Sequence, residues 1–140
     1  MSDTKSTIVE AEITLRSAPP DPLPVQARFR YDPADPYAVQ ATFHTEPEPQ
    51  TVTSTFAREL LATGIDQPAG LGDVRIWPSL WATPHGDLVL LALCSPNGQA
   101  VLEAPRKALF RFLRRTYALV PRGHETLYHD IDTTLARLLD

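Results

Sequence analysis

Paired carboxylates are the first side chains in this sequence that invite a chemical role. Asp32 and Asp35 lie three positions apart, and two such groups can bind a metal ion or share acid–base work. Each aspartate stands directly before a proline, Pro33 or Pro36. Aspartates beside prolines commonly build turns, because their side chains hydrogen-bond to the backbone just ahead. The pattern therefore favours a structural turn over a metal or catalytic site.

Histidine and cysteine, the other common metal ligands, are few. The chain has four histidines and one cysteine: His44, His85, His124, His129 and Cys94. A zinc site needs three or four converging ligands, and only His124 and His129 lie near each other in sequence. Ser95 stands in a turn before Pro96, outside any G-x-S-x-G elbow, and the glycines match no nucleotide-binding fingerprint. We therefore expect no metal, no cofactor, no catalytic residues and no enzymatic activity.

Basic side chains in the segment 105–119 form a candidate binding surface. Lys107, Arg111 and Arg114 recur at spacings of four and three residues, so a helix places them on one face, with Arg115 to its side. Charged faces are also normal on amphipathic helices, so a solvated face is the alternative interpretation. If this basic face binds a partner, its charge favours an acidic protein segment. Nucleic acid would use the same charges, but the net charge of −4 and the lack of an aromatic stacking series disfavour it.

Tryptophan provides the second candidate. Trp81 follows Leu80 in a loop beyond Pro78, and an exposed apolar loop costs solubility unless something covers it. Tryptophan is also enriched at interface hot spots. Trp77, by contrast, continues a predicted strand and is equally well explained as core. The partner-binding residues predicted from the sequence are Trp81, Lys107, Arg111, Arg114 and Arg115.

The elements that must carry these residues begin with strands. Alternating apolar and polar residues, or short β-branched and apolar runs bounded by proline and glycine, predict half-buried or buried strands. The predicted strands are Thr7–Arg16, Val25–Tyr31, Tyr37–Phe43, Thr51–Thr55, Asp73–Trp77, Leu88–Cys94 and Gln99–Glu103. Leu88–Cys94 is apolar at every position, so we expect it to be covered on both faces. The loop at 46–49 should join two strands as a hairpin.

Helices are expected at three places. The first covers Ala57–Thr63, and Gly64 supplies the left-handed residue that ends many helices. The second opens with Pro105 at its first position and runs to about Leu119. The third covers Thr133–Leu139 with Asp132 as its N-cap. The sum is a single α+β domain over residues 1–140, with mainly antiparallel sheet of about seven strands and two or three helices.

Composition narrows the classes of protein. With 140 residues, of which 43% are hydrophobic, the chain can bury a core of its own. A single cysteine excludes an internal disulfide and suits a reducing cytosol. The sequence MSDTKSTIVE has no leader-like apolar run, and no uncharged apolar stretch approaches membrane-spanning length. We therefore expect a cytoplasmic protein without an integral membrane segment.

Several separated segments together resemble one known family. These segments are RYDPADPYAV (30–39), FHT (43–45), FARELL (56–61), GLGDVRIWP (70–78), SPNG (95–98), LEAP (102–105) and FLRRT (112–116). In that order and spacing they resemble the SsgA-like proteins of sporulating actinobacteria, and are most similar to the SsgB type. The resemblance covers about residues 25–140.

The resemblance implies a role that spacing and composition do not reach. It implies control of sporulation-specific cell division, with the tubulin-like FtsZ and an SsgA-type paralogue as partners. It also implies a whirly-like fold, a homotrimer and concentration at the division septum, with no catalytic residues. Because whirly proteins bind single strands, a single-stranded nucleic-acid-binding module is the alternative function.

Overall fold

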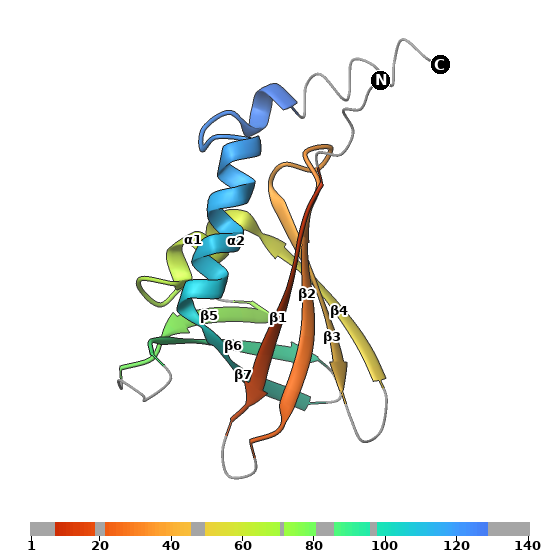
Figure 1. Cartoon of the computed structure of the whole chain (residues 1–140), viewed down its shortest axis with the longest axis vertical. Coiled ribbons are helices and arrows are strands. Elements are labelled where there is room, and N and C mark those ends of the chain that lie inside the picture. Colours follow the sequence, from red (N-terminus) through yellow and green to blue (C-terminus); the bar gives the residue numbers. More distant parts are fainter. Residues whose placement is uncertain are drawn as a thin grey trace.

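The structure is a computed structural model in which residues 8–18, 22–45, 50–70, 72–80, 86–95 and 98–128 are described. These residues form one antiparallel sheet of seven strands, in the order β4-β3-β2-β1-β7-β6-β5, and two helices (Figure 1). The elements are β1 (Val9–Ser17), β2 (Pro24–Tyr31), β3 (Ala38–Thr45), β4 (Gln50–Ala57), α1 (Arg58–Gly64), β5 (Val74–Pro78), β6 (Leu88–Ser95), β7 (Gly98–Pro105) and α2 (Arg106–Leu119). The predicted α+β class and strand number are confirmed.

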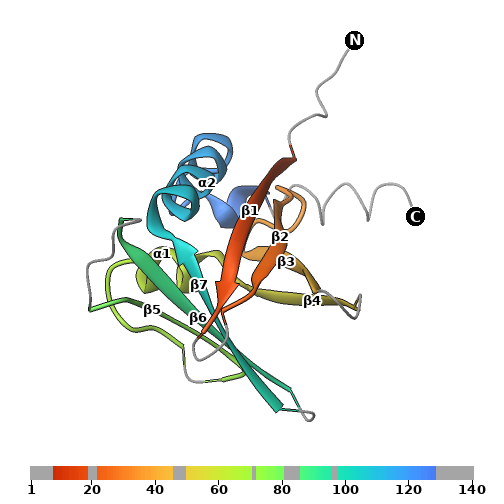
Figure 2. The same ribbon diagram turned by 60° about the horizontal axis from the view of Figure 1, so that its bottom comes forward.

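The sheet curls around α2, which packs across its concave face (Figures 1 and 2). Alternation along each strand decides which side chains face the helix, because successive residues point to opposite faces. In β1, Ile13 and Leu15 are buried while Glu12 and Thr14 are exposed. Four buried residues of the helix and its C-cap Val120 complete this core on the concave side; the helix residues are Leu109, Phe112, Leu113 and Thr116.

The hairpin between β3 and β4 forms as predicted, with Ala38 opposite Ala57 and Thr45 opposite Gln50. Tyr37 is the exception to the predicted pattern. It is the last residue of the turn at 33–37, directly before β3 begins, and 46% of its surface is exposed.

β6 lies inside the sheet, between β5 and β7, and its second face is covered only in part. Val89 and Leu91 are fully buried on the concave face, whereas Leu88 and Leu90 on the other face are half-buried. Helix α2 covers only the concave side, so the outer face of β6 keeps partial solvent contact. The apolar run therefore predicted the strand correctly, and the cover predicted for its second face is complete only at Ala92, which is 0% exposed.

Gly64 does not end α1 through a left-handed conformation, which corrects the prediction. It is the last residue of the helix, and the positive φ angles of the described residues occur at Gly70, Gly86, Gly98 and Gly123. Gly64 is needed for space instead. A Cβ there would overlap Cγ2 and Cβ of Ile76 and lie 3.0 Å from the Ile76 carbonyl oxygen. The missing side chain lets α1 lie directly on β5.

Helix α2 begins one residue later than predicted. Pro105 is its N-cap, with φ −64° and ψ 126°, and Arg106 is the first helical residue. The helix ends at Leu119 as predicted, and a further helical turn follows at 125–128. The third predicted helix, Thr133–Leu139 with Asp132, lies outside the described residues.

Replacing Gly64 with alanine should destabilise the fold by roughly 1–3 kcal/mol, because the methyl group forces α1 away from β5. Urea denaturation followed by circular dichroism measures the change in the free energy of unfolding. Gly72→Ala is the matched control, since nothing lies within 4 Å of the Cβ it would add, and a change within about 0.5 kcal/mol is expected there. Equal effects of the two substitutions would rule out the packing explanation.

Candidate protein-docking surface

A buried arginine fixes where α2 ends. Arg58, the first residue of α1, is only 1% exposed. Its Nη1 donates hydrogen bonds to the carbonyl oxygens of Thr116, at 3.2 Å, and Val120, at 2.8 Å. Its Nη2 donates to Oε2 of Glu125 at 2.8 Å. One guanidinium thus joins the start of α1, the last turn of α2 and the segment that follows α2.

Two tyrosine rings enclose the same guanidinium. Its central carbon lies 4.8 Å from the ring centroid of Tyr31 and 4.1 Å from that of Tyr117. Burial raises the pKa of Tyr31 to about 12, and its hydroxyl donates to the Pro36 carbonyl oxygen at 3.0 Å. The Nε of Arg58 has no hydrogen-bond partner among the described residues. The charge is therefore compensated by one carboxylate, two carbonyls and two aromatic faces.

This arrangement stabilises the carboxyl end of α2. The last carbonyls of a helix lack partners inside the helix and carry its partial negative charge, so a cation there is favourable. No basic residue of α2 itself lies in its last turn. Arg58 supplies that cation from another element, and it holds α2 against the concave sheet.

Arg58→Lys should lower the free energy of unfolding by roughly 3–5 kcal/mol, because a lysine ammonium cannot match this planar set of acceptors and the half-buried Glu125 would lose its guanidinium partner. Thermal and urea denaturation measure the loss. Arg28→Lys is the control at an exposed ion pair with Glu12, where less than about 1 kcal/mol is expected. If Arg58→Lys lowered the free energy of unfolding no more than Arg28→Lys does, the contacts of Arg58 would not be important for stability.

Glu125 is held ionised by its surroundings. Desolvation is the largest single influence and acts to raise its pKa, but several favourable interactions together outweigh it and lower the pKa below the usual 4.5. These are the hydrogen bond and charge of Arg58 and the backbone donors, including the Gly123 N–H, which lies 2.8 Å from Oε1. The side chain is 16% exposed. The carboxylate form is therefore the stabilising one.

Acid should weaken the protein through Glu125. Because the folded pKa lies below the unfolded value, the stabilisation is complete above about pH 4.5 and is lost as the pH falls through the folded pKa. Glu125→Gln should cost roughly 1–3 kcal/mol at neutral pH and progressively less in acid. Urea titrations of both proteins across this range measure the difference. A difference that stays constant with pH would contradict this assignment.

The face of α2 that points away from the sheet is exposed and cationic. Lys107, Arg111 and Arg114 lie on this face as their spacing predicted, and Phe110 stands among them with 44% of its surface exposed. Among the described residues, none of the three cations takes part in an ion pair. We call Lys107, Phe110, Arg111 and Arg114 the α2 face.

The two remaining basic residues of the helix are engaged elsewhere. Arg115, predicted as a partner contact, donates from Nη1 to the carbonyl oxygen of Glu10 on β1 at 2.9 Å. Arg106 pairs with Asp66 at 2.6 Å, and its guanidinium carbon lies 5.7 Å from the centroid of the Phe110 ring. Arg115 therefore ties the helix to the sheet, and Arg106 supports Phe110 from the side.

The charge of α2 is not explained by helix stability. The helix carries five basic and no acidic residues, in a chain with a net charge of −4. Two of them, Arg106 and Lys107, occupy the first turn, where the partial positive charge of the helix end makes cations unfavourable. Lys107 and Arg111 form a like-charge pair at four-residue spacing, which also costs a few tenths of a kcal/mol, about 0.2–0.5. The ion pair with Asp66 offsets part of this cost at Arg106, whereas Lys107 and Arg111 have no ion pair among the described residues.

Phe110 is the residue of this surface that the sequence prediction missed. Its neighbours Leu109, Phe112 and Leu113 are buried in the core. Phe110 falls three residues after Lys107, and in a helix this spacing places it on the cationic face. That spacing could have identified it from the sequence. Trp81 lies outside the described residues, so its predicted role stays a prediction, while its neighbour Leu80 is 90% exposed.

The carboxylates and histidines show no catalytic grouping within the described ranges. Asp32 accepts a hydrogen bond from the Ala34 N–H at 2.9 Å, which confirms the predicted turn. His44 lies 3.2 Å from the hydroxyl of Thr51 on the neighbouring strand. In the part of the chain that is described, no three His, Cys, Asp or Glu side chains gather as a metal site. His85 and His129 fall outside that part.

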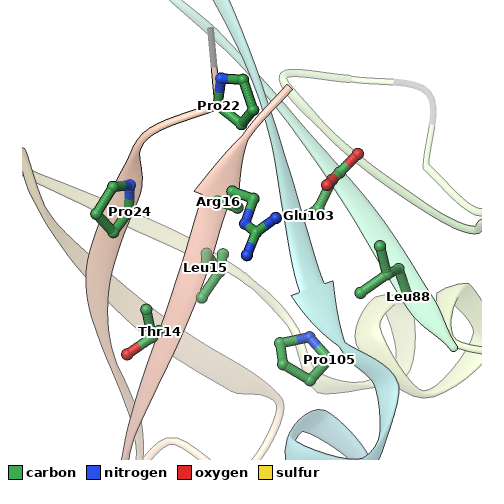
Figure 3. Close-up of a pocket in the computed structure, with 8 residues that line it drawn as sticks. All are labelled: Thr14, Leu15, Arg16, Pro22, Pro24, Leu88, Glu103 and Pro105. Carbon is green, nitrogen blue, oxygen red and sulfur yellow. The ribbon is translucent and has the colours of Figure 1, made fainter. Parts of the chain in front are cut away.

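A surface hollow of about 470 Å³ lies beside the short pairing of β1 with β7 (Figure 3). Arg16 and Glu103, which are register partners, contribute its two charged side chains. The hollow is lined by Thr14, Leu15, Arg16, Pro22, Pro24, Leu88, Glu103 and Pro105. These side chains include one acid and no histidine or cysteine, so they form no acid–base pair or metal-ligand set.

The fold and the surface together describe a protein with one curled sheet packed around a single long helix, and the most distinctive surface of this protein is the α2 face.

The family model described as "Streptomyces sporulation and cell division protein, SsgA" matches residues 25–125. The sporulation-specific cell division protein SsgB of Salinispora tropica is 57% identical over 142 residues, covering 99% of this chain and 98% of that protein. SsgB of Streptomyces coelicolor is 51% identical over 137 residues, covering 96% and 97%.

Solved structures give the same result. The crystal structure of an SsgA-like sporulation-specific cell division protein from Thermobifida fusca superposes with a TM-score of 0.85 at 44% identity, covering 98% of each chain. An SsgB structure, described with mutations that correlate to longitudinal cell division during sporulation of Streptomyces coelicolor, gives 0.79 at 52% identity, covering 86% of this chain and 94% of that one. The chain belongs to the SsgA family of sporulation and cell division proteins. The resemblance predicted from the sequence is confirmed.

No helix among the described residues has the length and apolar character needed to cross a membrane.

Proposed function

We propose that this chain is a non-catalytic adaptor that helps to position FtsZ at future septum sites during sporulation, acting with an SsgA-type paralogue. Its relatives are sporulation-specific cell division proteins, which supports the process but leaves the partner to be tested. The proposal includes a homotrimer in the cytoplasm that concentrates at the septum. Its mechanism is to present a rigid surface and to turn over no substrate.

The observation that carries the proposal is the α2 face. An exposed aromatic ring beside three cations that have no ion pair among the described residues resembles the aromatic and arginine anchors that dominate protein interfaces. Phe110 supplies apolar area, and Lys107, Arg111 and Arg114 supply charge on the same face. The complementary partner is an acidic protein segment with an apolar side chain to cover the ring. Attraction between unlike charges would also speed the encounter.

Rigid placement of this face supports the same function. The Arg58 junction holds one end of α2, and Arg106 ties its other end to Asp66. A surface that does not reorder on binding avoids part of the entropy cost of association. The α2 face therefore suits a docking protein that must hold a partner in place.

The double substitution Arg111→Glu with Arg114→Glu should weaken binding to purified FtsZ, or to the SsgA-type paralogue, at least about tenfold. Fluorescence anisotropy or biolayer interferometry measures the dissociation constants. The control is Arg16→Glu with Arg75→Glu, which changes the net charge equally on strands β1 and β5. The control should stay within about threefold of the natural chain.

Two results would contradict the proposal. The first is equal affinity of the α2 and control variants for both partners, with folding verified by circular dichroism. The second is tight binding of single-stranded oligonucleotides that falls steeply with salt, which the nucleic-acid-binding alternative predicts.

A further inference from the structure

The outer edge of β4 has no partner strand within the part of the chain that the structure describes. The sheet ends at β4 on one side and β5 on the other. The edge of β5 is partly covered by the chain itself, because Ala69 and Ile76 exchange backbone hydrogen bonds of 2.9 and 3.0 Å. β4 pairs with β3 alone among the described residues. Its outward backbone donors and acceptors therefore face no strand of the described ranges.

The side chains of β4 do not protect this edge. Natural edge strands are usually short, charged, bulged or interrupted by proline, because a free edge invites pairing with another chain. β4 has eight residues, with the sequence QTVTSTFA, and contains neither a charge nor a proline. Most of the strand is exposed. Its β-branched content favours extended pairing, so this edge is suited to accept a strand.

An apolar slot lies beside the edge. It has a volume of about 440 Å³ and opens where β4 and β5 begin and β6 ends. Val52 forms one wall and is 47% exposed, while Val74, Leu93 and Leu102 contribute apolar surface from β5, β6 and β7. Away from the slot, helix α1 contacts both β4 and β5 and so joins the two edge strands. Figures 1 and 2 show β4 diverging from β5–β7 away from α1.

Charge narrows the choice of occupant. Asp73 is the one charged side chain that lines the slot, and it has no ion pair among the described residues. A matching segment is therefore uncharged where it passes β4 and basic where it reaches Asp73. Extended segments place alternate side chains on one face, so every second residue would enter the slot.

We propose that β4 and this slot accept an extended segment of a partner protein as an eighth strand. The main chain of the segment would pair with β4. Its alternate apolar side chains would contact Val52, Val74 and Leu93, and a lysine or arginine at one end would meet Asp73. Strand addition of this kind obtains affinity from the backbone and specificity from the alternate side chains.

This second surface is independent of the α2 face. None of the residues that line the slot belongs to α2. A protein with two separate docking surfaces can hold two partners at once. Arg111→Glu with Arg114→Glu should leave strand addition unchanged, so failure of one proposal can be distinguished from failure of the other.

The probe is a short fluorescein-labelled peptide in which valine alternates with threonine and lysine stands at one end. Fluorescence anisotropy should show saturable binding to the natural chain. Val52→Lys, which places a charge in the slot, should weaken binding at least about tenfold. Thr51→Lys is the matched control, since Thr51 is also exposed but faces His44 on the other side of the sheet, and it should stay within about threefold of the natural chain.

Hydrogen exchange provides a second measurement on the folded proteins. Peptide binding should slow exchange of backbone amides in 50–57 in the natural chain and in Thr51→Lys, and not in Val52→Lys. Absence of peptide binding to the natural chain, or equal loss in the two variants, would overturn the proposal. Concentration-dependent dimerisation that Val52→Lys abolishes would also overturn it, because the occupant would then be a second copy of this chain.

Discussion

A positive charge buried inside the protein is the constraint on which the other features depend. Removing a guanidinium from water is costly, so it persists only where charge and hydrogen bonds replace the solvent. Around Arg58 those replacements come from the last carbonyls of α2, from Glu125 and from the rings of Tyr31 and Tyr117. The start of α1, the end of α2 and the following segment must therefore meet at one point. That meeting sets the position of α2 on the concave sheet.

The rotation of α2 about its axis then determines both its core and its surface. Phe112 packs against Phe29 of β2, with ring centroids 5.7 Å apart, and it cannot turn outward without opening the core. Phe110 is consequently held on the opposite side. The packing that stabilises the fold and the exposure on which the proposed docking depends follow from the same helix orientation. A side chain on this face can change its chemistry without disturbing the interior, provided that the inward residues are kept.

Local periodicity explains what could be predicted from the sequence. Alternation in β1 to β3, and helical spacing in α2, are encoded by neighbouring residues, so the strands and the cationic face were predicted correctly. Contacts between distant residues were not accessible in this way. The close approach of Gly64 to Ile76, and the partners of Arg58 beyond position 115, depend on how elements meet. Arg115 shows the same limit, because its bond to Glu10 joins residues 105 positions apart.

The charge pattern of α2 also links folding to recognition. Cations in the first turn and like charges at neighbouring positions along the helix leave the isolated protein under electrostatic repulsion. Binding of an acidic partner would relieve that repulsion, so the partner would stabilise the helix as well as cover its exposed face. Ligands that favour the folded state raise its stability by mass action. The bound chain should therefore resist heat and proteases better than the free chain, and its lifetime in the cell would depend on how much of its partner is present.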